Sequence, residues 1–180
     1  MQASYRIRLC SISDVPVLQA LIPLSARRLQ MQDYSTAQIE GALGTVFGVD
    51  TQLIRDGTYF VAEAEAVIVG CGGWSFRKTM FGSDSAKRGE DLRLDPAQEP
   101  ARIRAFFVHP DWARRGIGSE IMRQSELAAA AARFRRIEIV ATLIGEVLYE
   151  KFGYRVIERY EVPLQNGLQL PVVRMTKEII

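Results

Sequence analysis

The chain of 180 residues is long enough for one domain with a sizeable core, and its 48% hydrophobic and 24% charged residues are those of an ordinary globular protein. This composition excludes a chain that is disordered throughout. The formal net charge is only +2 at pH 7, so charge indicates no general polyanion-binding surface, and we expect no nucleic-acid partner.

The cysteines and the apolar runs bear on redox state and location. Cys10 and Cys71 lie far apart and form no CxxC pair, which argues against a disulfide framework or a zinc site. A single histidine, His109, argues against a histidine-rich metal site. The first residues lack the apolar stretch of a secretory signal, and no apolar run reaches the ~20 residues that a membrane span needs. We therefore expect a cytoplasmic protein with reduced thiols, no metal and no membrane partner.

The chain begins with a predicted strand and two helices. Alternation over residues 5–9 indicates a short, half-buried strand. Ser11 or Ser13 is a suitable cap for a first helix, which Pro23 should end or kink. The apolar face of this helix is expected to comprise Val17, Leu18, Leu21 and Ile22. A second helix is predicted over residues 35–44.

A hairpin and a long loop follow. Residues 58–64 and 66–74 are predicted to form an antiparallel hairpin with a tight turn near Glu65. Glycines in its second strand indicate a bulge or a close approach by another backbone. Residues 76–101 lose all periodicity, and we interpret them as a flexible loop insertion that is either a substrate-side flap or inert.

The second half of the chain alternates strands and helices. The pattern predicts, in order, a strand, a glycine-rich turn with a long helix, a strand, a short helix and two strands joined by a turn at Asn166-Gly167. The strands and the short helix are expected over 102–108, 137–141, 145–152, 154–162 and 172–176. The long helix should open within residues 114–119 and run to about residue 132. We therefore expect a single α/β domain over residues 1–180, with one mixed twisted sheet.

The stretch from Val108 to Ser119 is the most informative part of the sequence. A predicted strand ends there, the chain turns, and a helix begins whose first N–H groups have no intrahelical partner and can bind an anion. Gly116 and Gly118 let a diphosphate approach the backbone, and Arg114 and Arg115 add charge. Taken alone, the turn could also be a tight strand-to-helix connection. It matches neither the Rossmann nor the Walker pattern.

Three separated segments carry a family resemblance. Residues 113–118, Ala-Arg-Arg-Gly-Ile-Gly, resemble the phosphate turn Gln/Arg-x-x-Gly-x-Gly/Ala of the GNAT acetyltransferase superfamily. Residues 148–154, Leu-Tyr-Glu-Lys-Phe-Gly-Tyr, look like its Leu-Tyr-Glu-Lys-x-Gly-Phe segment, and residues 171–177 resemble its last strand. The chain departs from the pattern at Ala113, where Gln or Arg is usual, and at Thr142, where Asn is common.

The resemblance implies an α/β fold with a single mixed, mostly antiparallel twisted sheet flanked by helices. It also implies that acetyl-CoA lies in a V-shaped gap where the strand ending at Val108 splays from strand 137–141. The implied cofactor-binding residues are Phe106, Phe107 and Val108 through their main chains, Arg114, Arg115, Gly116, Ile117, Gly118 and Ser119 at the turn, and Thr142 and Lys151. Core packing is the alternative for Phe106 and Phe107.

The resemblance also implies catalytic roles. Tyr149 would be the general acid that protonates the leaving thiolate, whereas the alternative is a buried tyrosine tied to backbone. Glu63, Glu65 and Glu138 are candidate bases by residue type only. His109 is read as a turn residue, and no acyl-cysteine intermediate is expected.

The expected activity is transfer of an acetyl group from acetyl-CoA to a primary amine, by direct attack in a ternary complex. The acceptor is a small molecule or a peptide that the sequence does not identify. Trp74 and Phe76 either line its pocket or pack at the sheet edge against the first helices. The alternative function is a non-catalytic acyl-CoA sensor or regulatory domain. The sequence leaves the oligomeric state open, a homodimer included.

Overall fold

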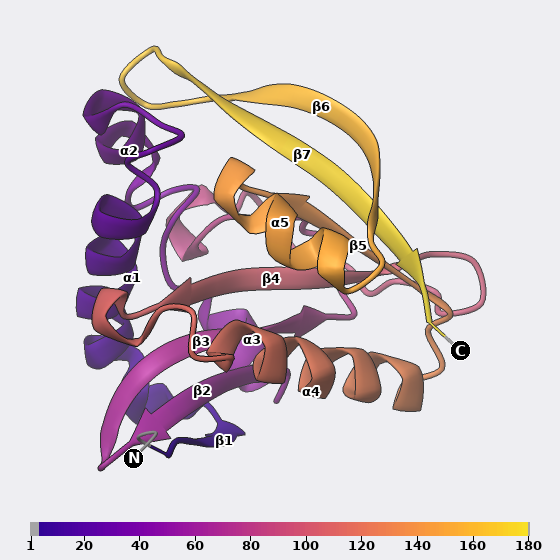
Figure 1. Cartoon of the computed structure of the whole chain (residues 1–180). Helices are drawn as coiled ribbons and strands as arrows, with labels where there is room; N and C mark the ends of the chain where they lie inside the picture. The colour runs from indigo at the N-terminus through magenta and orange to yellow at the C-terminus, as the bar shows by residue number, and fades with distance from the viewer. Residues whose placement is uncertain (1–3, 180) are drawn as a thin grey trace.

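The computed structural model describes residues 4–179, which form a mixed sheet with helices on both faces (Figure 1). The sheet has seven strands in the order β1-β2-β3-β4-β5-β7-β6. The strands are β1 (Arg6–Leu9), β2 (Tyr59–Ala64), β3 (Val67–Ser75), β4 (Ala101–Val108), β5 (Arg136–Ala141), β6 (Arg155–Pro163) and β7 (Gln169–Glu178). The predicted fold class is confirmed.

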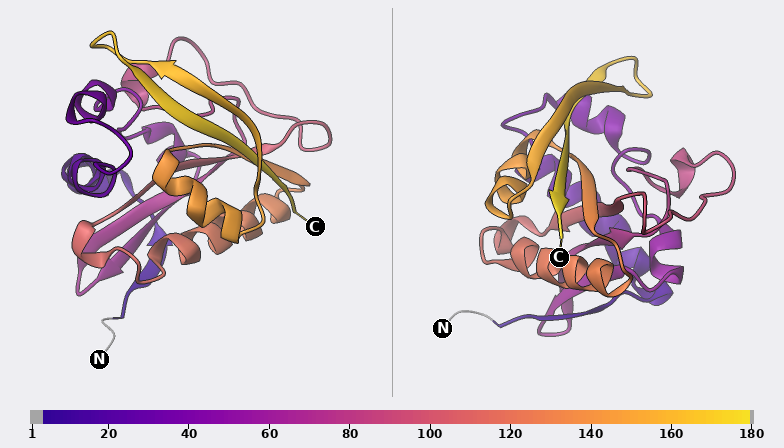
Figure 2. Two further views of the ribbon diagram at one scale, coloured as in Figure 1. Left: turned by 45° about the horizontal axis from the view of Figure 1, so that its top comes forward. Right: turned by 90° about the vertical axis from the view of Figure 1, so that its right-hand side faces the viewer.

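Helices lie on both faces of the sheet. They are α1 (Val15–Leu29), α2 (Thr36–Ala42), α3 (Thr51–Arg55), α4 (Ile117–Ala131) and α5 (Leu143–Lys151), with short 3-10 turns at η1 (Ile12–Asp14), η2 (Asp84–Ala86) and η3 (Pro110–Trp112). Helices α1 and α2 lie against one face, whereas α4 and α5 lie against the other (Figures 1 and 2). No helix between residues 4 and 179 is long and apolar enough to cross a bilayer.

The first helix differs from its prediction. Pro16 sits in the first turn as expected, but Pro23 lies inside α1 and the helix continues to Leu29. Of the two predicted effects of Pro23, an end of the helix is excluded, because buried residues on both sides of it, including Ile22 and Ala26, hold the helix against the sheet. Val17 is 44% exposed and does not belong to the buried face. The structure also adds α3, and it starts α5 at Leu143 rather than at residue 145.

The glycines of β3 mark close approaches. The predicted approach by another backbone occurs at Gly73, where a Cβ would clash with the Thr58 carbonyl, and two others lie against side chains. A Cβ at Gly70 would meet the Ile117 side chain at 2.6 Å, and one at Gly72 would meet the Phe106 ring at 2.7 Å. The absence of side chains on this face lets α4 and the Phe106 ring lie directly on the strand. These glycines thus determine how closely the phosphate-turn helix packs on the sheet.

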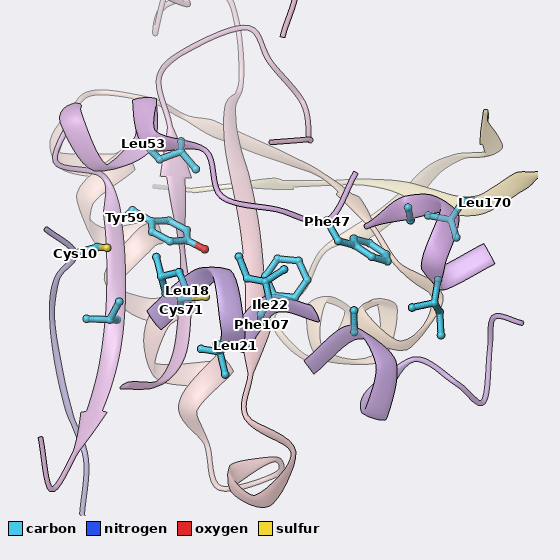
Figure 3. Packing of buried hydrophobic residues seen from close by; sticks show 14 of the residues in the cluster. Cys10, Leu18, Leu21, Ile22, Phe47, Leu53, Tyr59, Cys71, Phe107 and Leu170 are labelled. Atoms are coloured by element: carbon cyan, nitrogen blue, oxygen red, sulfur yellow. The ribbon is translucent and has the colours of Figure 1, made fainter. Parts of the chain in front are cut away.

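The main hydrophobic cluster lies between α1 and the sheet (Figure 3). Leu18 and Ile22 of α1 pack over Tyr59, Cys71 and Phe107 of the sheet. Both cysteines are free thiols, and burial raises the pKa of Cys71 to about 12. A thiol with so high a pKa stays protonated at neutral pH and is a poor nucleophile. The absence of an acyl-cysteine intermediate stays a prediction.

Residues 76–101 are attached to the rest of the chain by buried ionic contacts. Arg104 of β4, 1% exposed, donates to Asp50 Oδ2 at 2.9 Å and to the Gly82 carbonyl at 2.9 Å. Lys87 donates to Asp50 Oδ1 at 2.6 Å. Arg77 pairs with Asp56 at 2.6 Å. The flexibility expected for this loop stays a prediction, but its central part is joined to β4 through one carboxylate.

We predict that Asp50→Asn destabilises the fold by about 3 kcal/mol, because it leaves the buried Arg104 without a negative partner. Lys87 would keep only its longer ion pair with Asp91, at 3.8 Å. Urea unfolding followed by circular dichroism measures this loss. Asp33→Asn, at an exposed position, is the control and should change the unfolding free energy by less than ~0.5 kcal/mol. Equal stabilities of the two variants would contradict the proposed role of Asp50.

Candidate active site

The sheet opens between β4 and β5. These parallel strands pair only at Ala101 with Ile137 and at Arg102 with Glu138, and then diverge. Further along β4, a bulge sets Ala105 and Phe106 opposite the single residue Gly72, with a positive φ of 54° at Ala105. The result is the V-shaped gap that the resemblance implied, in which β4 beyond Arg102 has no β5 partner.

A pocket of about 70 Å³ lies in this gap. Both strands contribute to its walls, together with α5, the end of α1, the loop after β3 and the β6–β7 hairpin. The lining residues are Gln30, Val46, Phe47, Met80, Phe81, Gly82, Ile103, Ala105, Phe106, Phe107, Ile139, Val140, Ala141, Thr142, Tyr149, Val162, Leu170 and Val172. The pocket is therefore mainly apolar, as small-molecule sites usually are.

Tyr149 of α5 presents its phenol to the pocket. The residue is 5% exposed, and its ring packs edge-on against Phe106 and Tyr154 at centroid distances of 6.3 Å and 5.9 Å. Burial alone raises the pKa of the Tyr149 phenol above its ordinary value, and no hydrogen bond within residues 4–179 contributes to that shift. The hydroxyl is thus protonated at neutral pH and free to donate to a bound group.

The turn before α4 is built to present backbone N–H groups. Arg114 and Gly116 both adopt positive φ, 62° and 86°, and Gly116 is the N-cap residue of the helix. The first helical bond runs from the Glu120 N–H to the Gly116 carbonyl. The N–H groups of residues 117–119 precede it, so they have no intrahelical acceptor and lie at the positive end of the helix dipole.

The surroundings of this turn fit a diphosphate. A Cβ at Gly118 would come within 3.2 Å of Leu148 Cδ2, so glycine keeps the space between α4 and α5 open. Arg114 and Arg115 are exposed, and the Arg115 guanidinium lies 4.9 Å from the centre of the Trp112 ring. Unpaired amides, an open approach and two cations are together what a phosphate group requires.

The other residues predicted to bind the cofactor are divided between two places. Phe106, Phe107 and Thr142 line the pocket together with Tyr149. Val108 does not line it, and its N–H donates to Ser25 Oγ at 3.2 Å. Lys151 is exposed at the end of α5. The structure thus assembles the pocket residues in the gap and the phosphate-turn residues at the start of α4.

Trp74 and Phe76 lie away from this pocket. Trp74 is buried, and its ring packs edge-on against Phe76 at 5.9 Å and Phe134 at 6.0 Å. Both pack in the cluster with Ala129 of α4, so this packing is not the predicted one against the first helices. Their assignment to the acceptor pocket gains no support from this placement.

The candidate bases are also elsewhere. Glu138 is held by Arg174 at 2.7 Å and lines a separate depression over β5, β6 and β7. Glu63 pairs with Arg8 at 2.9 Å. His109 accepts a hydrogen bond from the Asp111 N–H at Nδ1, as a turn histidine does. No carboxylate or imidazole lines the pocket in the described part of the chain.

Gln30 is a pocket residue that the sequence did not indicate. It follows the last turn of α1, is 6% exposed, and its Oε1 has no hydrogen-bond partner in the described structure. An unsatisfied buried amide oxygen costs about 1–3 kcal/mol. A glutamine at a helix end carries no functional signal in sequence, because only the fold brings it to the gap.

The fold and the site together define an acyltransferase-type α/β protein. The chain belongs to the GNAT acetyltransferase family, whose model, described as an acetyltransferase (GNAT) domain, matches residues 55–156. A comparison with curated proteins gave no match.

Solved structures share the fold across nearly the whole chain. A GCN5-related N-acetyltransferase from Rhodopseudomonas palustris superposes with a TM-score of 0.72 at 21% identity, covering 99% of this chain and 98% of that one. The PaiA N-acetyltransferase from Thermoplasma acidophilum, solved with coenzyme A, gives 0.64 at 14% identity and 98% and 99% coverage. An agmatine N-acetyltransferase gives 0.62 at 14% identity and 97% and 99% coverage. Identities this low establish the fold alone.

We predict that Gly118→Val weakens acetyl-CoA binding at least about 100-fold, because a branched side chain fills the space beside the free amides. Calorimetric titration measures the affinity. Leu127→Val is the matched control, since it puts the same residue at an exposed position of the same helix and should leave the affinity unchanged. Tight binding to a folded Gly118→Val variant would show that the turn is only structural.

Proposed function

We propose that the protein transfers an acetyl group from acetyl-CoA to a primary amine by direct attack in a ternary complex. The observation that carries the proposal is the pocket in the β4–β5 gap, into which Tyr149 presents a protonated and unbonded phenol. The free N–H groups at the start of α4 support diphosphate binding on the same face of the sheet as α5. The complex of the PaiA enzyme with coenzyme A supports acyl-CoA as the donor.

In the proposed reaction, the amine nitrogen attacks the thioester carbonyl carbon, the carbon–sulfur bond breaks, and the thiolate takes the Tyr149 proton. The attacking amine loses a proton to water. After product release, a proton from water restores the Tyr149 phenol. The desolvation that raises the pKa of Tyr149 also raises the pKa of the leaving thiol. The phenol can therefore still protonate the thiolate inside the pocket. Unpaired β4 amides would polarise the carbonyl.

Holding both reactants accounts for most of the expected rate enhancement. The gap is narrow, and Phe106 and Phe107 form one of its walls. Fixing an amine next to a thioester converts a bimolecular reaction into an effectively unimolecular one, which can contribute about 7–11 kcal/mol. A cysteine relay is not needed, because neither thiol lines the pocket.

A titration with acetyl-CoA, free CoA and NADH is the first test. Saturable binding of both CoA species but not of NADH is the expected result, because NADH lacks the pantetheine that the open edge of β4 would bind. Failure to bind either CoA species would refute the proposal. Binding without turnover on any amine would favour the alternative, a non-catalytic acyl-CoA sensor.

We predict that Tyr149→Phe lowers kcat about 100-fold or more and leaves the acetyl-CoA affinity unchanged, because only the proton donor is lost. Release of free thiol during turnover measures kcat. Tyr154→Phe is the matched control: this neighbouring buried phenol donates to Met122 Sδ at 3.6 Å and does not line the pocket. Unchanged turnover in Tyr149→Phe would remove Tyr149 from the mechanism.

A further inference from the structure

The pocket walls suggest which amine the protein accepts. Of the lining residues, only Gln30, Thr142 and Tyr149 have polar side chains, and none is charged. Four phenylalanines contribute to the walls, and Phe47 and Phe107 pack edge-on at 5.9 Å. A cavity with this lining stabilises apolar groups and disfavours ions.

The pocket opens between two different groups of elements. Thr142 and Tyr149 belong to α5, on the face that carries α4 and its free amides. Phe47, Leu170 and Val172 belong to the cluster on the opposite face, beneath α1 and the β6–β7 hairpin. Since the donor's diphosphate would lie at α4, the acceptor's place is the opposite side, where Gln30 lies.

Nearby ionic groups are already paired with one another. The carbonyl of Gly82, a pocket residue, accepts from Arg104, which is paired with Asp50. Asp50 also binds Lys87, so its carboxylate has two cationic partners. No carboxylate therefore remains at the wall to receive a second ammonium group of a substrate.

We propose that the acceptor is a primary amine on an uncharged, apolar body, an arylalkylamine or alkylamine, and that Gln30 accepts a hydrogen bond from its nitrogen. This inference rests on the proposed function. Gln30 lines the pocket, and its Oε1 is enclosed and has no partner in the described structure. Half a turn of the terminal amide exchanges Oε1 and Nε2, and in that orientation Oε1 would accept from an amine N–H in the pocket.

The same arrangement accounts for the absence of a base in the pocket. An apolar environment favours the neutral amine over the ammonium ion, and only the neutral amine has the lone pair that attacks. A neutral amide accepts one N–H and leaves that lone pair directed elsewhere. A carboxylate in this position would instead stabilise the unreactive ammonium form.

Steady-state kinetics with a panel of amines tests the substrate class. At saturating acetyl-CoA, 2-phenylethylamine and hexylamine should show kcat/KM at least about tenfold above 1,4-diaminobutane and spermidine, since desolvating a second charge is unfavourable. A preference for the polycationic amines would overturn the inference while supporting the proposed function. Loss of all turnover and amine binding, with acetyl-CoA still bound, would overturn both.

Variants at Gln30 test its role. Gln30→Leu should raise the KM for 2-phenylethylamine about tenfold and leave the KM for acetyl-CoA unchanged, because it removes one hydrogen bond on the acceptor side only. Gln30→Glu should shift the preference towards 1,4-diaminobutane. Gln19→Leu, the same change at an exposed position of α1, is the control. Equal amine KM values in Gln30→Leu and the wild type would exclude Gln30 from the site.

Discussion

The separation of β4 from β5 is the feature on which the site depends. A sheet that parts in its middle leaves backbone N–H and C=O groups unpaired, which is costly in a buried position unless another group binds them. Here the ladder ends at Arg102 and Glu138, and the bulge at Ala105 turns the rest of β4 further out of register. Packing on both faces of the sheet holds the gap open and offsets the free-energy cost of the unpaired groups.

Packing on the α4 face fixes the side chains at this opening. Gly72 leaves room for the Phe106 ring, which then lies edge-on to Tyr149, while Gly70 admits Ile117 of α4. One glycine-rich strand thus positions both the proposed proton donor and the helix that presents free amides. Aromatic edge-on pairs contribute about 0.5–1.5 kcal/mol each beyond burial, enough to favour a single ring orientation.

The sequence predicted the features that depend on local pattern. The β2–β3 hairpin, the turn at Gly116 and the α4 helix follow from alternation, glycine position and helical periodicity, and all are present. Pro23 does not end the first helix, because tertiary packing of α1 outweighs one lost helical hydrogen bond. The sequence does not indicate Gln30, and the placement of Trp74 and Phe76 in the acceptor pocket has no support from the structure. In both cases the direction of a side chain depends on contacts that are distant in sequence. The cofactor-binding and catalytic roles stay predictions.

The loop of residues 76–101 connects stability with the proposed specificity. Met80, Phe81 and Gly82 form part of the pocket wall, and Gly82 is bound to Arg104 in the middle of β4. Asp50 pairs with Arg104 and with Lys87, and Asp91 is a second anion beside Lys87, so the contacts that hold the loop in place also keep these charges paired away from the pocket. Asp50 is 37 residues from Lys87 and 54 residues from Arg104 in the sequence, so no local pattern predicts this part of the pocket wall. The apolar character of the pocket therefore depends on the ion pairs that hold the loop in place as well as on the residues that line it.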